Sequence, residues 1–529
     1  MAELDTIFFG SIKKKNHLFF LVLLMIPIGL NGGIVSLASV YITGSTSAIP
    51  ADITMAAYAQ AIGLVLGIPG IFTLKKVVPS RFALVTVYVA LIISNIALGH
   101  TDQPLIIVMA SFVSGFFKII GILEILNSML PILMPHGERY RLYSIYYPLT
   151  SIMSQLSSII VVKVADLYNW QFGQMFLNIS LFAGLILVIF VIHPWRIEPK
   201  GQLTEFDWFD LLLIAIGMLL MNYVLSYGLT FDWFSSPRIL IAGIGCLLVL
   251  SLILVRTIVV ERPAVDLTVL SFGSVRFGLI ALFLVSLFYV GSNIQNSMLS
   301  IILKGNAPEI TRINLFVIIG YLVGALIGFF YYSYYNSFKT VMITVVFFYS
   351  LSFLILYFES ASVAESSAFY LPSILKGMAV ILTYMAVGIF IAEGVPFSNF
   401  VSLTFFYLFT RVFLGPAVWS AILSYIYYHR LIYHIDRLAT RIDVSDSHQQ
   451  ELFGPSLQSS IRAGLSTDQA VNLSTRTVFG RVANQASLLT SQEIFGGLVI
   501  FGLLFVVFIF VVKVYQKTNQ RIKDEIVLP

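Results

Sequence analysis

The chain has 529 residues, of which 58% are hydrophobic and only 11% are charged, with a net charge of +5. Soluble domains carry about 25% charged residues, so this chain has too few to cover a water-facing surface. Its mean hydropathy of +0.92 places it in a lipid bilayer. The basic residues stand at the ends of apolar runs rather than in one patch, which favours anionic lipid headgroups, and no nucleic-acid partner is expected.

The apolar runs predict an all-α membrane protein. A bilayer core of about 30 Å needs about 20 apolar residues per helix. The run that follows Lys13–Lys15 has no small-residue cleavage site, so it is expected to be a first spanning helix and not a signal peptide. Fourteen transmembrane helices are predicted, near residues 17–41, 54–74, 82–99, 104–126, 143–165, 172–193, 209–228, 238–256, 277–301, 313–333, 340–358, 368–392, 399–427 and 494–514.

The short loops predict the orientation, because cytoplasmic loops carry an excess of Lys and Arg. If the N-terminus is cytoplasmic, the short outer loops hold only Arg238, Lys304 and Arg312. The inner segments then hold Lys13–Lys15, Lys75, Lys76, Arg81, Arg139, Arg141, Arg196, Lys200, Arg256, Arg262, Arg276, Lys339, Lys517, Arg521 and Lys523. We therefore expect a multi-pass protein of the cell inner membrane with both termini in the cytoplasm.

Residues 428–493 form a polar segment between the last two predicted spans, on the outer face in this topology. The stretch 467–487 is compatible with a helix. Loops of this length are usually functional or disordered. Two interpretations stay open: a docking surface for a periplasmic partner, and a poorly ordered insert.

Sequence motifs for enzymatic chemistry are missing. The single cysteine, Cys246, excludes a disulfide framework and a zinc site. The sequence has no P-loop, H-E-x-x-H, C-x-x-C or nucleophile-elbow motif, and its histidines have no metal-binding spacing. We expect no catalytic residues, no metal and no cofactor, and hence no enzyme.

Four ionisable side chains lie inside predicted spans: Lys118, Glu124, Lys376 and Arg411. Such a group costs roughly 2.5–3.5 kcal/mol at the bilayer centre, so its presence indicates a function. Lys118 and Glu124 are six residues apart and point about 120° apart on a helix, so each is expected to find its partner elsewhere.

The span 277–301 adds a group of uncharged polar residues, which includes Asn293 and Gln295 together with Ser292 and Asn296. Amide side chains are able both to donate and to accept hydrogen bonds. Asn293 and Gln295 are therefore candidates for substrate binding.

Several motifs in the second half of the chain occur together and in order. They are Asp207 at the start of a span, the turn Asp232–Ser236, the linker Pro263-Ala264-Val265-Asp266-Leu267, Phe409-Thr410-Arg411 with Gly415, Arg430 with His434, and Glu493-Ile494-Phe495. This series resembles the EmrB/QacA-type drug exporters of the major facilitator superfamily, which have fourteen helices.

The resemblance implies a domain organisation. Residues 1–200 would form an N-terminal six-helix half, residues 201–270 two inserted helices and a linker, and residues 271–529 a C-terminal six-helix half that includes the periplasmic loop 428–493. In that family helices 1, 4, 9 and 12 line a central cavity, and the two halves rock about it. The resemblance thus places Lys118, Glu124, Lys376 and the Asn293–Gln295 group on cavity helices.

The sequence departs from this family at its coupling residues. The acid of the family's first helix is Asn31 here, which can hydrogen-bond but carries no proton at physiological pH. The loop motif around Gly70–Lys76 has no acid, the expected arginine of helix 4 is Ser111, and Ser157–Val162 replace a glycine-rich signature. Proton-coupled antiport by the family's usual residues is therefore not implied.

Glu124 is the candidate for a relocated proton site, because a carboxyl removed from water holds a proton more readily. A structural ion pair, and a position near the cytoplasmic surface where the group stays hydrated, remain alternatives. Lys118 and Lys376, with Arg411, would give the cavity a positive field suited to an anionic or zwitterionic amphipathic cargo. Alternatively the lysines extend to an interface and Arg411 braces helix packing.

The sequence predicts a secondary active transporter that exports small amphipathic molecules. By the resemblance, it would be proton-coupled and would work with a periplasmic membrane-fusion adaptor and an outer-membrane channel. Two alternatives stay open: an uptake or facilitative carrier on the same scaffold, and a non-transporting membrane sensor or assembly protein that acts through residues 428–493.

Overall fold

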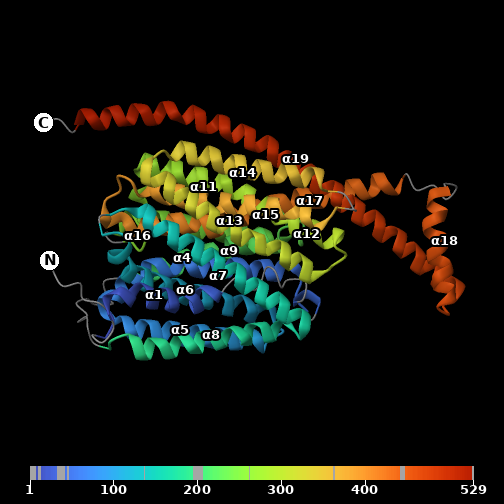
Figure 1. The fold of residues 1–529 in the computed structure, drawn as a ribbon, viewed down its shortest axis with the longest axis horizontal. Helices are drawn as coiled ribbons and strands as arrows, with labels where there is room; N and C mark the ends of the chain where they lie inside the picture. Colours follow the sequence, from blue (N-terminus) through green and yellow to red (C-terminus); the bar gives the residue numbers. More distant parts are fainter. Residues whose placement is uncertain are drawn as a thin grey trace. The chain divides into compact units, whose positions relative to one another are not determined.

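The computed structural model describes residues 7–9, 13–31, 42–44, 47–135, 137–194, 207–260, 263–360, 364–440 and 447–526. These residues are almost entirely helical (Figure 1). A single isolated bridge, between Phe8 and Ile192, is the sole extended pairing within these ranges.

The helices of the first part of the chain are α1 (His17–Leu30), α4 (Pro50–Val77), α5 (Ser80–Gly99), α6 (Pro104–Leu133), α7 (Arg139–Leu167), α8 (Trp170–Val191), α9 (Trp208–Tyr227) and α10 (Pro237–Val259). Those of the second part are α11 (Gly273–Gly291), α12 (Ile294–Ile302), α13 (Ala307–Tyr334), α14 (Phe338–Phe358), α15 (Tyr370–Ala392), α16 (Phe400–Leu408), α17 (Gly415–Ala439), α18 (Ser447–Arg462) and α19 (Thr467–Ile526).

Within the described ranges, thirteen helical stretches are long and apolar enough to cross a membrane. They correspond to the predicted spans from 54–74 onward. The first predicted span, 17–41, is described only as far as Asn31, since residues 32–41 lie outside the described ranges. The all-helical membrane class is confirmed, and the number of fourteen is not.

Two of the predicted spans are not regular helices. The span 277–301 is interrupted between α11 and α12, at Ser292 and Asn293. The span 399–427 contains a π-helical segment, Phe409–Leu414 (η7), between α16 and α17. Such π-helical turns frequently mark functional sites.

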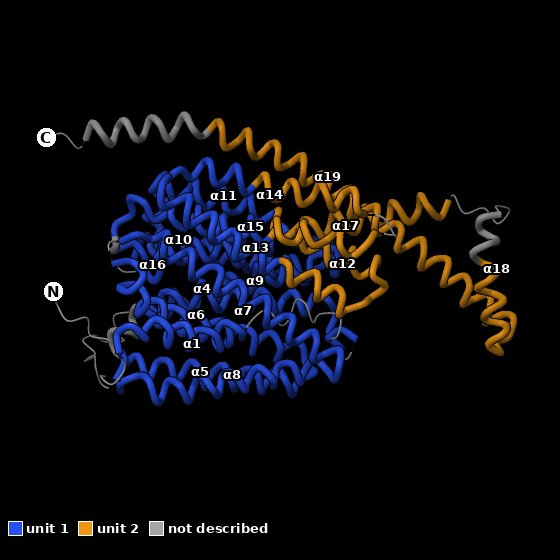
Figure 2. The backbone as a smooth tube through the Cα atoms, viewed as in Figure 1, with its two compact units in different colours: residues 1–287, 317–345, 377–421 blue, residues 288–316, 346–376, 422–529 orange. Residues whose placement is uncertain are grey.

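The chain groups into two compact units (Figure 2). Unit 1 consists of residues 1–287, 317–345 and 377–421, and unit 2 of residues 288–316, 346–376 and 422–529. The predicted division into two six-helix halves concerns a different property, the repeat of helices along the chain, and stays a prediction.

Glycines allow a close helix crossing in unit 1, between α4 and α6. A Cβ atom on Gly115 would lie 2.0 Å from the Gln60 carbonyl oxygen, and one on Gly63 would lie 2.2 Å from that of Phe112. In lipid the hydrophobic effect does not drive helices together, so small residues that let backbones approach supply much of the packing energy.

The same crossing occurs between α13 and α15, again within unit 1. A Cβ atom on Gly377 would lie 2.4 Å from the Val317 carbonyl oxygen, and one on Gly324 would lie 2.9 Å from Met378 backbone atoms. These helices are the second and fourth of the predicted C-terminal half, as α4 and α6 are of the N-terminal half. The two helix pairs thus share the same kind of glycine-mediated contact.

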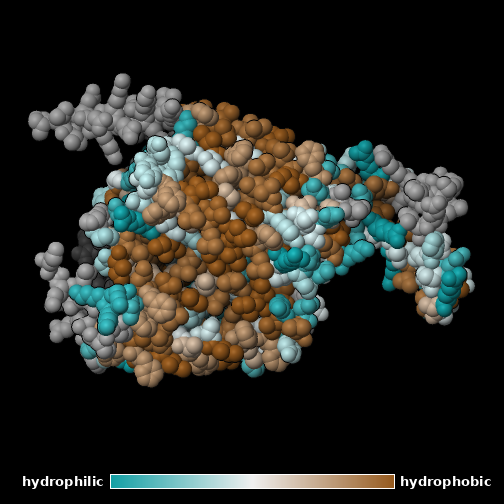
Figure 3. Space-filling model, viewed as in Figure 1, coloured by the Kyte–Doolittle hydropathy of each residue, from teal (hydrophilic) through white to brown (hydrophobic). Residues whose placement is uncertain are grey.

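The outward faces of the helices are apolar. On α10, Ile241, Leu247, Ile258 and Val259 are each at least 67% exposed. Figure 3 shows broad hydrophobic areas over the face in view. A soluble protein rarely exposes large contiguous apolar patches, so this surface is suited to acyl chains.

The polar segment 428–493 is mostly helical in unit 2 and not an irregular loop. α17 continues to Ala439, α18 packs against α19, and α19 begins at Thr467, which confirms the expected helix over 467–487. Glu493 joins α19 to α17, because its carboxylate accepts from Arg430 at 2.6 and 2.7 Å and lies 3.1 Å from the His434 ring. Residues 441–446 lie outside the described ranges.

The α4–α6 crossing predicts that Gly115→Ala lowers thermal stability. The new methyl group would meet the Gln60 backbone, which is unable to turn aside as a side chain would, so the helices must separate at a cost of about 1–3 kcal/mol. Thermal melting of the detergent-purified protein checks this. Gly243→Ala on α10, where nothing lies within 4 Å of the new Cβ, is the matched control. An unchanged melting temperature for Gly115→Ala would contradict the crossing.

Candidate functional site

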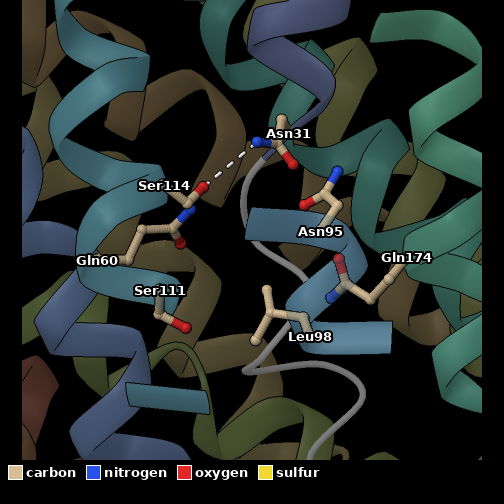
Figure 4. A pocket seen from close by; sticks show the side chains of 7 residues that line it. All are labelled: Asn31, Gln60, Asn95, Leu98, Ser111, Ser114 and Gln174. Atoms are coloured by element: carbon tan, nitrogen blue, oxygen red, sulfur yellow. Dashed lines mark hydrogen bonds between the residues drawn. The ribbon is translucent and has the colours of Figure 1, made fainter. Parts of the chain in front are cut away.

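A small polar cavity lies inside unit 1, in the predicted N-terminal half (Figure 4). It is lined by Asn31, Gln60, Asn95, Leu98, Ser111, Ser114 and Gln174. These residues come from the end of α1 and from α4, α5, α6 and α8. The cavity is of the size of a water molecule rather than of a cargo molecule, so it is not by itself a cargo site.

Asn31 stands at the C-cap of α1 and is 1% exposed. Its Nδ2 donates to Ser114 Oγ on α6 at 3.3 Å, as the dashed line in Figure 4 shows. The structure thus places this candidate residue at a hydrogen-bonded junction of two helices. Most of the motif that follows it, residues 32–40, lies outside the described ranges.

Other polar side chains of the cavity were not foreseen. Asn95 Nδ2 donates to Asn178 Oδ1 at 3.1 Å, whereas Asn95 Oδ1, Ser111 Oγ and Gln174 Oε1 are buried without a hydrogen-bond partner among the described residues. Each unsatisfied buried group costs about 1–3 kcal/mol, so the cavity is polar enough to hold water. In the sequence these residues are recognisable as uncharged polar side chains that recur within apolar spans.

Lys118 lies one helical turn beyond Ser114 on α6 and is partly buried. Its Nζ donates to the Gly29 carbonyl oxygen at 3.4 Å. Gly29 belongs to the last turn of α1, where carbonyl groups have no partner within the helix. A cation at a helix C-terminus is also favoured by the helix dipole. Lys118 therefore caps α1 and brings a positive charge beside the polar cavity.

Lys376 makes an equivalent contact within unit 2. Its Nζ donates at 3.4 Å to the carbonyl oxygen of Ser292, the residue directly after the end of α11. The Asn296 amide donates to Asn293 instead, which leaves the Ser292 oxygen available. In each predicted half, a lysine on the fourth helix thus donates to a carbonyl group at the C-terminal end of a helix, α1 in one half and α11 in the other.

The structure separates the two amides of the 277–301 span. Gln295 is 3% exposed, and its Nε2 donates to Ser373 Oγ at 3.1 Å, one turn from Lys376 on α15. Asn293 is exposed and makes no side-chain cap at the start of α12. Gln295 and Lys376 are therefore brought to one cluster, and the Asn293 side chain is not part of it.

Glu124 is 3% exposed on α6, and its backbone oxygen accepts from the Ser128 hydroxyl. Lys118 on the same helix donates to the Gly29 carbonyl oxygen. The burial of Glu124 weighs against the alternative of a hydrated surface group. Its role in proton binding stays a prediction.

Arg411 lies in the π-helical segment η7 and faces three tyrosine rings of unit 1. Its Cζ is 3.6 Å from the ring centroid of Tyr384 on α15, 4.9 Å from that of Tyr147 on α7 and 5.8 Å from that of Tyr407 on α16. The guanidinium thus joins three helices through cation–π contacts. This arrangement fits the expected role of Arg411 in bracing helix packing.

The other motif residues build connections. Asp207 caps α9 by accepting from the Asp210 amide at 3.0 Å and forms an ion pair with Arg256 on α10. Asp210 Oδ2 accepts from the Ala264 amide at 2.9 Å, and the Asp266 amide donates to Ser402 Oγ at 2.9 Å. These residues therefore fasten the linker to α9 and α16 and are not candidates for cargo binding.

Comparisons with known proteins agree with this picture at the level of the fold. The chain is similar to the multidrug export protein EmrB of Haemophilus influenzae, with 23% identity over 304 residues that cover 54% of this chain and 56% of that protein. The chain thus spans about half the length of this curated relative. No family model matches the chain.

Solved transporter structures match over most of the chain. The tetrameric PepTSo2 structure aligns with a TM-score of 0.57 and 11% identity, covering 96% of this chain and 100% of that one. The peptide transporter POT in complex with sulfate gives 0.53 and 15%, covering 94% of each chain. A mutant of the nucleoside transporter NupG gives 0.51 and 15%, covering 78% of this chain and 92% of that one.

At such identities the likeness establishes the fold alone. The chain is an all-helical membrane protein with the major facilitator fold. The solved relatives in this fold are transporters, in agreement with the expectation that the chain is not an enzyme.

The contact between Lys118 and Gly29 predicts that stability and activity respond differently to Lys118→Met. The 3.4 Å hydrogen bond contributes little to the stability of the fold, whereas burying the ammonium group is costly. An apolar side chain of similar length is therefore expected to leave the melting temperature unchanged or to raise it. Transport should fall several-fold. Melting curves and flux on the same preparation check both. A large loss of stability would indicate a purely structural lysine.

Proposed function

We propose that this protein is a secondary active transporter that exports small amphipathic molecules across the inner membrane. The observation that carries the proposal is the presence of charged side chains, Lys118, Lys376 and Arg411, inside the helices of a transporter fold. Ionisable groups within a membrane are costly, and they mark substrate and ion pathways.

The direction of transport is supported by the partial similarity to EmrB, whose name describes export. The location and the orientation, with both termini in the cytoplasm, are supported by the Lys and Arg excess in the loops assigned to that side. Reporter fusions at the two ends test the orientation, and a signal from opposite sides of the membrane would rule it out.

A proton gradient is the proposed driving force, with Glu124 as the group that binds the proton. The support is its burial on α6, the helix that also carries Lys118 and lines the polar cavity.

A periplasmic adaptor that leads to an outer-membrane channel is the proposed partner. The support is the helical pair of α18 and the first turns of α19, which is polar and largely exposed, for example at Arg462, Asp468 and Arg476. Cross-linking in whole cells tests this. If no envelope protein is captured from this helical pair, the adaptor proposal fails while the transport proposal stands.

A facilitative carrier is the second candidate. The observation that favours it is Asn31, a neutral amide hydrogen-bonded to Ser114 at the position where the resembling family has an acid. In that case cargo would cross in either direction along its own gradient, and a proton gradient would not accelerate it.

Flux in proteoliposomes tests the function directly. The purified protein is reconstituted with an internal pH-sensitive dye, and efflux of fluorescent amphipathic compounds is followed with and without an imposed pH gradient. Gradient-driven movement of cargo together with protons supports the proposal. Gradient-independent movement supports the facilitative carrier, and movement of nothing supports a sensor or assembly protein.

Glu124→Gln is expected to abolish the acceleration by the pH gradient, because the amide has nearly the same shape and cannot carry the proton. Cargo exchange without a gradient should persist within about twofold if the site still folds. Glu493→Gln, which makes the same change at the α17–α19 junction of unit 2, is the control. Gradient-driven flux that survives Glu124→Gln would exclude Glu124 as the proton site.

A further inference from the structure

Arg411 is a membrane-embedded cation for which the described chain offers no hydrogen-bond acceptor and no carboxylate. Three tyrosine rings surround its guanidinium, at 3.6, 4.9 and 5.8 Å from Cζ. Its buried Nε has no hydrogen-bond partner among the described residues. An aromatic ring presents its π face to the cation and supplies no oxygen acceptor for the N–H donors of the guanidinium.

Two other arginines lie near an aromatic ring and also have a carboxylate partner. Arg256 lies 4.8 Å from the ring of Phe209 and is also paired with Asp207. Arg430 lies 4.8 Å from the ring of Tyr433 and is also paired with Glu493. Each of these two arginines has an ion pair as well as a cation–π contact, whereas Arg411 has cation–π contacts and no ion pair among the described residues.

Aromatic rings compensate only part of the cost of burying this charge. A desolvated cation–π contact is worth about 2 kcal/mol or more, whereas an unpaired buried charge costs several. A guanidinium that has no oxygen acceptor among the described residues retains its planar fork of N–H donors, which matches the two oxygens of a carboxylate. The residue is therefore preorganised for an anion that the chain itself does not supply.

We propose that Arg411, Tyr147, Tyr384 and Tyr407 form the binding site for the carboxylate of an aromatic anionic cargo. The carboxylate would accept from the edge of the guanidinium, and the aromatic part of the cargo would pack against the tyrosine rings. This inference rests on the transport function proposed above and narrows its cargo to one chemical class.

The side chains of this site differ in burial. Arg411 and Tyr384 are partly exposed, although both lie within membrane-spanning helices, whereas Tyr147 and Tyr407 are 3% and 6% exposed. Gly388 keeps room for the Tyr147 hydroxyl, which would lie 2.8 Å from a Cβ at that position. The π-helical segment sets Arg411 off the regular helical register.

The site draws on both predicted halves. Tyr147 belongs to α7, in the predicted N-terminal half, and Tyr384, Tyr407 and Arg411 belong to α15, α16 and η7, in the predicted C-terminal half. All four lie in unit 1. A cargo bound here would contact both halves at once, which allows its binding free energy to depend on how the halves are arranged.

Binding of matched naphthalene compounds to the full-length protein tests the site. The probes are 2-naphthoate, neutral 2-naphthamide and cationic 2-naphthylmethylammonium, measured by calorimetry in nanodiscs of phosphatidylcholine, which has no net charge. The anion is expected to bind about tenfold or more tightly than the amide, since charge-assisted hydrogen bonds to a buried arginine are worth about 1.5–3 kcal/mol. Equal affinities in the wild-type protein would overturn the proposal without any variant.

Variants assign the effect to this residue. Arg411→Gln should remove the preference for naphthoate, and Arg411→Lys should retain part of it, because lysine keeps the charge but not the planar fork. Tyr384→Leu should weaken all three probes, and Tyr384→Phe should change them little. Arg256→Gln, which removes an arginine that has its own carboxylate, is the matched control. A preference that survives Arg411→Gln, or is lost in Arg256→Gln, contradicts the site.

Flux of the same probes separates this inference from the proposed function. Naphthoate that binds at Arg411 but is not moved leaves the site intact and removes the transport function. Transport of the ammonium or amide probe with no preference for naphthoate retains the function and removes the site. Arg411→Lys, should Arg411→Gln fail to fold, still distinguishes a bidentate anion site from a simple positive field.

Discussion

Backbone carbonyl groups that lose their helical partners inside a membrane need another donor, and this constraint organises the interior of the protein. An unsatisfied polar group in hydrocarbon costs several kcal/mol. α1 ends at Leu30 and α11 at Gly291, both inside predicted spans. Lys118 and Lys376 donate to the carbonyl groups at these ends. The positive charge of the interior is therefore placed at helix ends, where carbonyl groups lack a partner within the helix.

The ionisable residues divide into two groups by their partners. Asp207, Arg256, Arg430 and Glu493 are paired with opposite charges, and they join neighbouring helices. Among the described residues, Lys118 and Lys376 donate to backbone oxygens, and Arg411 faces aromatic rings. A charge that has no fixed counter-ion is free to interact with one that arrives from outside. The first group therefore stabilises the arrangement of the helices, and the second group contains the candidates for binding a charged cargo.

The sequence was sufficient for properties that depend on local composition. Apolar length placed the spans from 54–74 onward, and the cost of buried charge singled out Lys118, Glu124, Lys376 and Arg411. Features that depend on distant neighbours were missed. The break at Ser292 has no proline beside it, and a lysine from another helix contacts it. The π-helical segment Phe409–Leu414 is followed by Gly415 and Pro416, whose missing amide disturbs a regular helix, but this pattern does not by itself predict a π-helix. The cavity and the tyrosines around Arg411 bring together residues far apart in the chain, which no local periodicity records.

The length of α19 has a mechanical consequence. This helix runs without a break from Thr467 to Ile526, and at 1.5 Å per residue its 60 residues extend about 90 Å, roughly three times the thickness of the bilayer core. A continuous helix transmits rotation and tilt along its axis. A partner bound near Thr467 is therefore able to rotate or tilt the apolar part of α19, because both belong to one continuous helix.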